Sequence, residues 1–332
     1  MNRGMLAAAI AAVVATTAFA QTKEVTIGYQ DMVVPYRMAQ EAKALEAATG
    51  YKVNWKQFGG GGEVIKAMAS GAVQVGEIGS AGISAAVSRG EPLELFWILD
   101  DIGDAEALVA KKGSGIAKVA DLKGKRIAMP FNSTTHFHTM VALDQAKINP
   151  ADVKILNMRP PEVRAAWQRG DIDATFIWDP VLAEAKKDGS VVITSGQITA
   201  ATGKATFDGY VANKDWAKAN RDFMVKFVKV LADADARYRA DGKNWKAGGP
   251  EVAAIAKWSG SKPEDVPAAI ALYRFPSAKD QSTTWLGGGK GSIAAKALAA
   301  TAEFQLSQKQ IEKTLLDYSA VVNATYAAEA AK

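Results

Sequence analysis

Polar and aromatic residues recur where predicted strands pass into predicted helices. Five such loops are Gln30-Asp31, Gly79-Ser80-Ala81, Asn132-Ser133-Thr134-Thr135-His136, Trp178-Asp179-Pro180 and Phe207-Asp208-Gly209. In open α/β sheets, ligands bind beyond the carboxyl ends of the strands, where loops lead into helix N-termini. These loops are therefore the places to look for a ligand site.

The hydroxyl residues in two of these loops suit an anion. Ser80, Thr134 and Thr135 stand at predicted helix starts, where side-chain O–H groups, backbone N–H groups and the positive end of the helix dipole come together. The alternative is ordinary N-capping, which Ser and Thr perform in many helices without any ligand.

Two acidic residues and one aromatic residue could complete such a site. Asp208 and Glu106 are candidate partners for a ligand ammonium group, although each could instead cap a turn or pair with a Lys or Arg. Trp178 at a strand end could form a flat apolar wall, with core packing as the alternative.

The sequence contains no complete motif for catalysis or metal binding. The run Gly59–Gly62 lacks the Lys-Ser/Thr of a phosphate-binding loop, and Gly287–Ser292 interrupts that pair, so we expect both to be flexible turns. Ser80 is not in a G-x-S-x-G elbow, and His136 and His138 are spaced to point to different sides of a helix. The chain has no Cys, which excludes a thiolate nucleophile and a Cys-ligated metal. From these observations together we predict no catalytic residues, metal or cofactor.

The elements that must position these loops alternate in type along the chain. One set of predicted strands is Val25–Ile27, Lys52–Trp55, Val73–Gly76 and Leu93–Ile98, and a second set is Arg126–Met129, Val153–Leu156, Ala174–Ile177 and Val191–Ile193. Helical patterns lie between them; one from Glu63 places Val64, Ile65 and Met68 on one side and ends near Gly71. This alternation predicts α/β lobes with mainly parallel sheets.

The two sets of strands predict two lobes joined by two crossing segments. Lys112–Gly115 marks the expected seam, Gly209–Ala212 is the strand that returns, and the chain beyond Lys214 is helical. We therefore assign residues 21–109 with 213–332 to lobe 1 and residues 110–212 to lobe 2. Lobes joined in this way form a hinged clamshell.

Composition and the N-terminus limit the partners and the compartment. The formal net charge of +5 is spread along the chain, which argues against nucleic acid, and 48% hydrophobic residues can supply a sizeable core without disulfides. Arg3, an apolar run over Met5–Val14 and the ending Ala18-Phe19-Ala20 form the pattern of a cleaved signal peptide at residues 1–20. We expect export to the periplasm.

Several longer motifs resemble a known family. They are Ala67-Met68-Ala69-Ser70-Gly71, Gly79-Ser80, Gly124-Lys125-Arg126-Ile127-Ala128, Pro130-Phe131-Asn132-Ser133-Thr134-Thr135-His136 and Ala165-Ala166-Trp167-Gln168-Arg169-Gly170-Asp171-Ile172-Asp173. The chain resembles, over nearly its whole mature length, the taurine-binding periplasmic proteins of bacterial ABC importers. The wider group also binds nitrate, aliphatic sulfonates and thiamine precursors.

The resemblance implies a fold, a ligand and partners. The implied fold is a type II periplasmic binding protein that acts as a monomer and delivers taurine, or a related sulfonate, to an importer permease and its ATPase. The implied ligand contacts are Gln30, Gly79, Ser80, Glu106, Thr134, Thr135, Trp178 and Asp208. The hydroxyl groups are expected to hold the sulfonate, and Asp208 and Glu106 the ammonium.

Departures from the pattern keep two alternatives open. Ala81 stands where a second Ser is usual, which predicts one hydroxyl fewer in the anion pocket, and Asp179 beside Trp178 would favour a more cationic ligand. Asp101 and Asp104 add further acidity before Glu106. The alternatives are a receptor for alkanesulfonates or another small anion, and an enzyme like those that make the thiamine pyrimidine. The enzyme is disfavoured because those relatives use a Cys-rich motif and this chain has no Cys.

Overall fold

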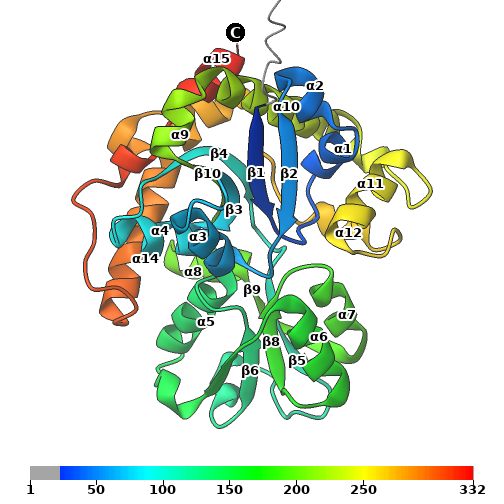
Figure 1. Cartoon of the computed structure of the whole chain (residues 1–332). Helices are drawn as coiled ribbons and strands as arrows, with labels where there is room; N and C mark the ends of the chain where they lie inside the picture. The colour runs from blue at the N-terminus through cyan, green and yellow to red at the C-terminus, as the bar shows by residue number, and fades with distance from the viewer. Residues whose placement is uncertain (1–22, 332) are drawn as a thin grey trace, which may run out of the picture.

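The protein folds around two separate sheets. A computed structural model describes residues 23–331 and places five strands in each sheet (Figure 1). The first sheet, in spatial order, is β2 (Lys52–Gln57), β1 (Glu24–Tyr29), β3 (Val75–Gly79), β10 (Phe207–Asn213) and β4 (Leu93–Asp101). The second is β7 (Lys154–Asn157), β6 (Arg126–Met129), β8 (Ala174–Ile177), β5 (Ala107–Lys111) and β9 (Gly189–Thr194). Each sheet with its helices is called a lobe below.

Helices cover both sheets (Figure 1). The first lobe carries α1 (Tyr36–Glu41), α2 (Ala44–Thr49), α3 (Gly61–Ala69), α4 (Ser80–Ser88), α9 (Lys214–Ala219), α10 (Arg221–Asp241), α11 (Pro250–Ser259), α12 (Val266–Ile270), α13 (Ala278–Asp280), α14 (Ile293–Ser307) and α15 (Thr325–Ala330). The second lobe carries α5 (Thr134–Gln145), α6 (Pro160–Arg169), α7 (Val181–Asp188) and α8 (Ser195–Thr202). The prediction of two α/β lobes is confirmed.

The prediction of mainly parallel sheets is right for four of the five strands in each sheet, and one strand in each runs the opposite way. In the first sheet β1 is parallel to β2 and β3, whereas β10 runs antiparallel to β3 and β4. The second sheet repeats this arrangement, with β6 parallel to β7 and β8, and β5 antiparallel to β8 and β9. The antiparallel strands are those by which the chain enters the second sheet and returns to the first. Both sheets are therefore mixed.

The β3–α4 region shows how the sequence builds one edge of the site. All five residues of β3 are buried, and α3 packs on it through Val64, Ile65 and Met68, the face expected from the sequence. A Cβ atom at Gly76 would lie 2.4 Å from Cγ1 of Val64, so glycine is needed for this close packing. The result is a rigid strand that ends at Gly79, where α4 begins.

The lobes also pack against each other. Phe137 of α5 and Phe304 of α14 meet edge to face with ring centroids 5.5 Å apart. Ala81 of α4 is buried in the same apolar cluster as these two residues. Helices from the first lobe therefore complete part of the core of the second.

The chain passes between the sheets at residues 102–106 and again at 195–206. The first passage lies ahead of β5, so the Gly-rich segment at 112–115, predicted as the seam, lies beyond a strand of the second sheet. The division into residues 21–109 with 213–332 and 110–212 stays a prediction. The predicted signal peptide at residues 1–20 lies outside the described residues.

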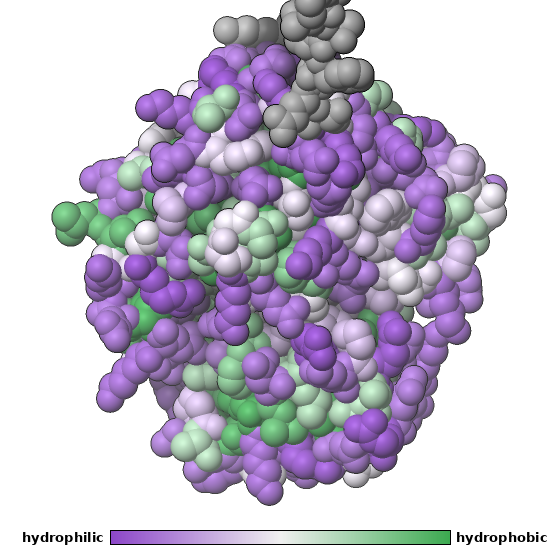
Figure 2. Space-filling model, viewed as in Figure 1, coloured by the Kyte–Doolittle hydropathy of each residue, from purple (hydrophilic) through white to green (hydrophobic). Residues whose placement is uncertain are grey.

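The hydropathy of the surface and of the helices agrees with a fold that buries its apolar residues. Figure 2 shows hydrophilic residues over most of the face in view, with a hydrophobic area on the lower lobe. Among the helices within residues 23–331, none has the length and apolar character needed to cross a membrane.

Candidate ligand-binding site

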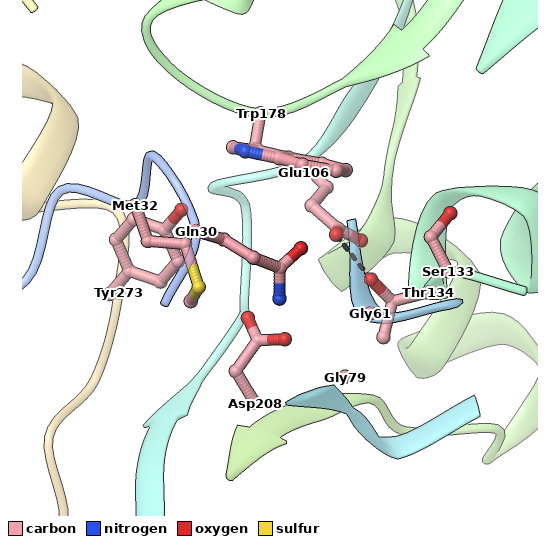
Figure 3. Close-up of a pocket in the computed structure, with 10 residues that line it drawn as sticks. All are labelled: Gln30, Met32, Gly61, Gly79, Glu106, Ser133, Thr134, Trp178, Asp208 and Tyr273. Carbon is pink, nitrogen blue, oxygen red and sulfur yellow. Dashed lines mark hydrogen bonds between the residues drawn. The ribbon is translucent and has the colours of Figure 1, made fainter. Parts of the chain in front are cut away.

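The candidate site is a cavity between the two lobes (Figure 3). Its lining side chains lie close together and leave room of only about 10 Å³ for the centres of water-sized molecules. Its lining residues are Gln30, Met32, Gly61, Gly79, Asp208 and Tyr273 from the first lobe, Ser133, Thr134 and Trp178 from the second, and Glu106 from the first passage between them. A ligand in this cavity would touch both lobes.

Six of the eight predicted contact residues line this cavity: Gln30, Gly79, Glu106, Thr134, Trp178 and Asp208. They come from segments almost 180 residues apart in the chain, and only the fold brings them together. Their contact with a ligand stays a prediction.

The other two predicted residues, Ser80 and Thr135, do not line the cavity. The Ser80 hydroxyl is fully buried and accepts a hydrogen bond from the Phe207 backbone N–H, at 3.3 Å. The Thr135 hydroxyl bonds instead to the Ser133 hydroxyl, at 2.8 Å. Both side chains therefore secure the loops behind the cavity wall.

Two helix N-termini meet at one side of the cavity. Helix α4 begins at Ser80 directly after Gly79, and α5 begins at Thr134, capped by Ser133, whose hydroxyl accepts from the His136 N–H at 3.1 Å. A Cβ at Gly79 would lie 2.8 Å from Cγ2 of Thr134, so glycine permits the close approach of the two helices. Backbone N–H groups and the positive ends of two helix dipoles thus favour an anion here.

Glu106 lies deep in the cavity wall, held by hydroxyl groups. The Thr134 hydroxyl donates to Oε1, shown as the dashed line in Figure 3, and Ser195 Oγ lies 3.0 Å from Oε2. Burial removes water from the carboxyl group and raises the pKa of Glu106 to about 7. The charged form of Glu106 is therefore unfavourable while the cavity holds no cation.

Asp208 projects into the cavity opposite Trp178 (Figure 3). Its neighbour across the β10–β4 ladder is Asp100, which is fully buried and whose carboxyl oxygens have no hydrogen-bond donor within residues 23–331. Burial, together with nearby carboxyl groups such as Glu106, raises the pKa of Asp208 and of Asp100 well above the ordinary range. None of the cavity-lining residues among the described ones is Lys or Arg.

Gln30 is held in place by a buried ion pair behind it. Arg37 and Glu77, both with fully buried side chains, pair at 2.7 Å, and the Glu77 carboxylate also accepts from the Gln30 backbone N–H at 3.0 Å. The Gln30 side-chain amide donates to the Glu77 carbonyl at 3.0 Å. Its amide group extends toward the space between Glu106 and Asp208 (Figure 3).

Trp178 closes the cavity and links the lobes. Its indole Nε1 donates to Asp31 Oδ1 of the first lobe at 2.9 Å, and its side chain is 5% exposed. Trp178 also packs in an apolar cluster of the second lobe, and its contact with a ligand stays a prediction. The indole N–H adds a contact across the cleft.

The four residues that depart from the family pattern do not line the cavity. Asp179 caps α7 by accepting from the Ala183 N–H at 2.8 Å, so it adds no carboxylate to the site. Ala81 is buried in the apolar cluster between the lobes and does not line the cavity. The Ser-to-Ala difference at this position therefore removes no hydroxyl group from the cavity. Asp101 pairs with Arg274 at 3.7 Å, and Asp104 accepts from the Thr194 hydroxyl.

Four lining residues, Met32, Gly61, Ser133 and Tyr273, were missed from the sequence. The run Gly59–Gly62 was expected to be a turn, but Gly61 and Gly62 form the start of α3. Ser133 lies within a loop identified as a candidate, and Met32 follows the Gln30-Asp31 loop, so both could have been predicted from the sequence. Tyr273 follows α12, far along the chain, and no local signal marks it.

The histidines have structural partners. His136 stacks on Phe131 with ring centroids 4.4 Å apart, and His138 is fully buried in hydrogen bonds to Ser195 and Lys204. Across residues 23–331, no group of three or more His, Cys, Asp or Glu side chains is arranged to hold a metal ion.

Two mixed α/β lobes around a small polar cavity define the class of type II periplasmic binding proteins. The alkanesulfonate-binding protein SsuA from Xanthomonas axonopodis pv. citri, solved bound to MOPS, shares this fold. The TM-score is 0.73 at 24% identity, covering 90% of this chain and 97% of that chain.

Sequence comparison gives the family. Residues 39–241 match the family model described as NMT1/THI5 like. The taurine-binding periplasmic protein of Escherichia coli (strain K12) is 35% identical over 307 residues, 92% of this chain and 93% of the relative. A putative aliphatic sulfonates-binding protein of the same strain is 28% identical over 282 residues, 83% of this chain and 85% of the relative. The chain belongs to the NMT1/THI5-like family, and the predicted resemblance is confirmed.

Proposed function

We propose that this protein is a periplasmic receptor that captures taurine between its two lobes and delivers it to an ABC importer. One observation carries the proposal: two helix N-termini and buried carboxyl groups without a basic partner line the same cavity. A small zwitterion carries an anionic group for the helix N-termini and a cationic group for the carboxyl groups. The taurine-binding relative supports the choice of ligand.

The sulfonate end would lie against the N-termini of α4 and α5. Backbone N–H groups near Gly79 and Thr134 would donate to its oxygens, with the Gln30 amide as a further donor. Ser80 and Thr135 would act indirectly, since their hydroxyls are bonded to protein groups that shape the two loops. This revises the direct contacts expected from the sequence.

The ammonium end would lie between Asp208 and Glu106, with Trp178 over the two-carbon linker. A buried charge without a partner costs several kcal/mol, so an ammonium group gains from these carboxylates and they gain from it. A ligand that lacks the amine would leave the acidic side of the cavity uncompensated. The arrangement thus selects for an aminosulfonate.

Delivery would follow closure of the lobes. The two lobes would close around the ligand, and the closed form would be recognised by the permease, with an ATPase driving import. The protein would act as a monomer after removal of residues 1–20. It needs no cofactor for this role and performs no reaction on its ligand.

A receptor for alkanesulfonates without an amine is the second candidate. It is favoured by the bonds that Glu106 makes to Thr134 and Ser195, which satisfy this carboxyl group without a ligand cation. Asp208 decides against it, because this side chain faces the cavity without a cation. The relatives compared above are named as binding proteins, which weighs against an enzyme.

A thermal-shift screen of the purified protein tests the proposal. The probes are taurine, ethanesulfonate, sulfate and nitrate, because a ligand that binds only the folded state raises the apparent stability. We expect the largest rise in Tm with taurine and a smaller one with ethanesulfonate. A rise with nitrate or sulfate and none with taurine would contradict the proposal.

A further inference from the structure

A chain of buried hydrogen bonds leads from the cavity into the second lobe. Oε2 of Glu106 lies 3.0 Å from Ser195 Oγ, which lies 2.8 Å from Nδ1 of His138. Nε2 of His138 lies 2.9 Å from the carbonyl oxygen of Lys204. Glu106, Ser195 and His138 are each at most 3% exposed, so the protein supplies their hydrogen-bond partners.

Counting hydrogens along this chain fixes a protonation state. The Lys204 carbonyl can only accept, so Nε2 of His138 carries a hydrogen, and in a neutral ring Nδ1 must then accept. The one hydroxyl hydrogen of Ser195 is used for Nδ1. Ser195 then has none left for Glu106, and the 3.0 Å contact is a hydrogen bond only when Glu106 carries a proton on Oε2.

The extra proton could instead sit on His138, with a charged Glu106 at the other end of the chain. Burial decides against this arrangement, because it lowers the pKa of His138 to about 4 and raises that of Glu106 to about 7. The neighbouring acidic groups agree. Asp208 on β10 and Asp100 on β4 lie near Glu106, and ionisation of one of these carboxyl groups disfavours ionisation of the others.

Other groups around the chain do not supply a charge that changes this assignment. On α5 the neighbour of Glu106 is the neutral Thr134, and Tyr273 is the phenol nearest the carboxyl groups. Near His138, the ammonium of Lys204 lies over the Phe304 ring, 5.6 Å from its centroid. The ring of His138 itself lies beside Phe137 and Phe176.

We propose that Ser195 and His138 are positioning residues that keep Glu106 protonated in the empty cavity, so that capture of a ligand ammonium group releases one proton. This inference rests on the proposed function. The O–H bond of Glu106 breaks, its proton passes to solvent or buffer, and the carboxylate pairs with the ammonium. Because one proton leaves, affinity for taurine rises with pH, by up to about tenfold per unit, until Glu106 is already ionised in the empty protein.

Calorimetry measures the released proton directly. Taurine is titrated into the protein in two buffers of different ionisation enthalpy, at about pH 6 and about pH 8, and we expect close to one proton released at the lower pH and far less at the higher. Taurine binding without proton release at either pH would overturn the inference and leave the proposed function intact. Absence of taurine binding would instead contradict the proposed function.

Two variants should both lower the pH midpoint of taurine affinity. His138→Leu frees the Ser195 hydroxyl to donate to the Glu106 carboxylate, which favours the charged form. Ser195→Ala removes the acceptor of the Glu106 proton, which disfavours the protonated form. Thr139→Val is the control, because Thr139 is a buried hydroxyl on the same helix that donates to the Thr135 carbonyl at 2.8 Å. A merely structural role would lower affinity in both variants with the midpoint unmoved, and that result would overturn the inference.

The empty protein offers a test that needs no ligand. The chain has two histidines, so ¹⁵N NMR with His136→Gln as the assignment variant isolates the His138 signals. Near neutral pH we expect a neutral ring with hydrogen on Nε2 and a bare Nδ1. Hydrogen on Nδ1, whether in the other tautomer or in the imidazolium, would overturn the inference.

Discussion

Two buried acidic regions lie side by side in the first sheet and differ in how their charge is compensated. Glu77 on β3 is paired with Arg37 at 2.7 Å and also accepts from the Tyr210 hydroxyl at 2.6 Å. Asp208 and Asp100, on the neighbouring β10 and β4, are buried beside each other without a basic partner among the described residues.

The difference separates structure from function. The Arg37–Glu77 pair is complete, so it fixes Gln30 and the strand ends that surround the cavity. The carboxyl groups of Asp208 and Asp100 have no cationic partner. A buried charge without a partner is unfavourable for folding and is retained where function requires it. We infer that the first region holds the site in shape and that the second is left for the cation of a ligand.

The largest effect on stability is expected from breaking the Arg37–Glu77 ion pair. Arg37→Met leaves Glu77 buried without a cation, which should lower the free energy of unfolding by about 3–5 kcal/mol. Urea unfolding measures it. Adding Glu77→Gln to the same chain should recover most of the loss, whereas Lys52→Met, which breaks an exposed pair with Glu24, should cost at most about 1 kcal/mol. A loss in Arg37→Met no larger than in Lys52→Met would remove the distinction between the two regions.

The pH dependence of stability reports on Glu106, Asp208 and Asp100, the carboxyl groups without a basic partner. The pKa of Glu106 rises from 4.5 to about 7 on folding, so between these values the folded protein binds more protons than the unfolded chain. Stability of the empty protein should therefore fall as pH rises through this window, with Glu106 contributing about 3 kcal/mol and Asp208 and Asp100 acting in the same direction.

Unfolding experiments at several pH values with Glu106→Gln isolate this contribution, since Gln imitates the protonated carboxyl group. The variant should have a flatter profile than the unmodified protein. Identical profiles would mean that Glu106 is charged in the empty cavity.

A smaller effect is expected at the contact that closes the two lobes. Asp31→Ala removes the acceptor for the Trp178 indole without altering a cavity-lining residue, and it should weaken taurine binding by about 1 kcal/mol, roughly fivefold. Asp188→Ala is the matched control, because Asp188 accepts from the Trp167 indole at 2.7 Å within the second lobe. Equal taurine affinity in the two variants would show that the contact across the cleft does not favour the closed form.

Much of the fold could be predicted from local pattern, because β-branched runs and apolar helix faces are properties of short segments. Arg126–Met129 and Ala174–Ile177 are strands with the predicted bounds. The reversed direction of β10 could not be predicted, since β10 pairs with β3 and β4 more than 100 residues earlier. Such pairing is decided by the tertiary fold.

The candidate site was predictable where residue type and position agree. Gln30 and Trp178 follow β1 and β8, Asp208 lies at the start of β10, and all three line the cavity. Ser80 was not separable from Thr134, because a hydroxyl at a helix start can serve a ligand or the protein backbone, and only the positions of neighbours decide. The His138–Ser195–Glu106 chain was equally hidden, since its members lie 57 and 89 residues apart.

The most direct test of the central claim is calorimetry of taurine and ethanesulfonate with the unmodified protein and with Asp208→Asn. The two ligands share the sulfonate and differ in the amine, so the variant should lose about 2–5 kcal/mol of binding free energy for taurine. Its affinity for ethanesulfonate should be unchanged or higher, because the uncompensated carboxyl group is gone. Equal losses for the two ligands would contradict the assignment of Asp208 to the ammonium group.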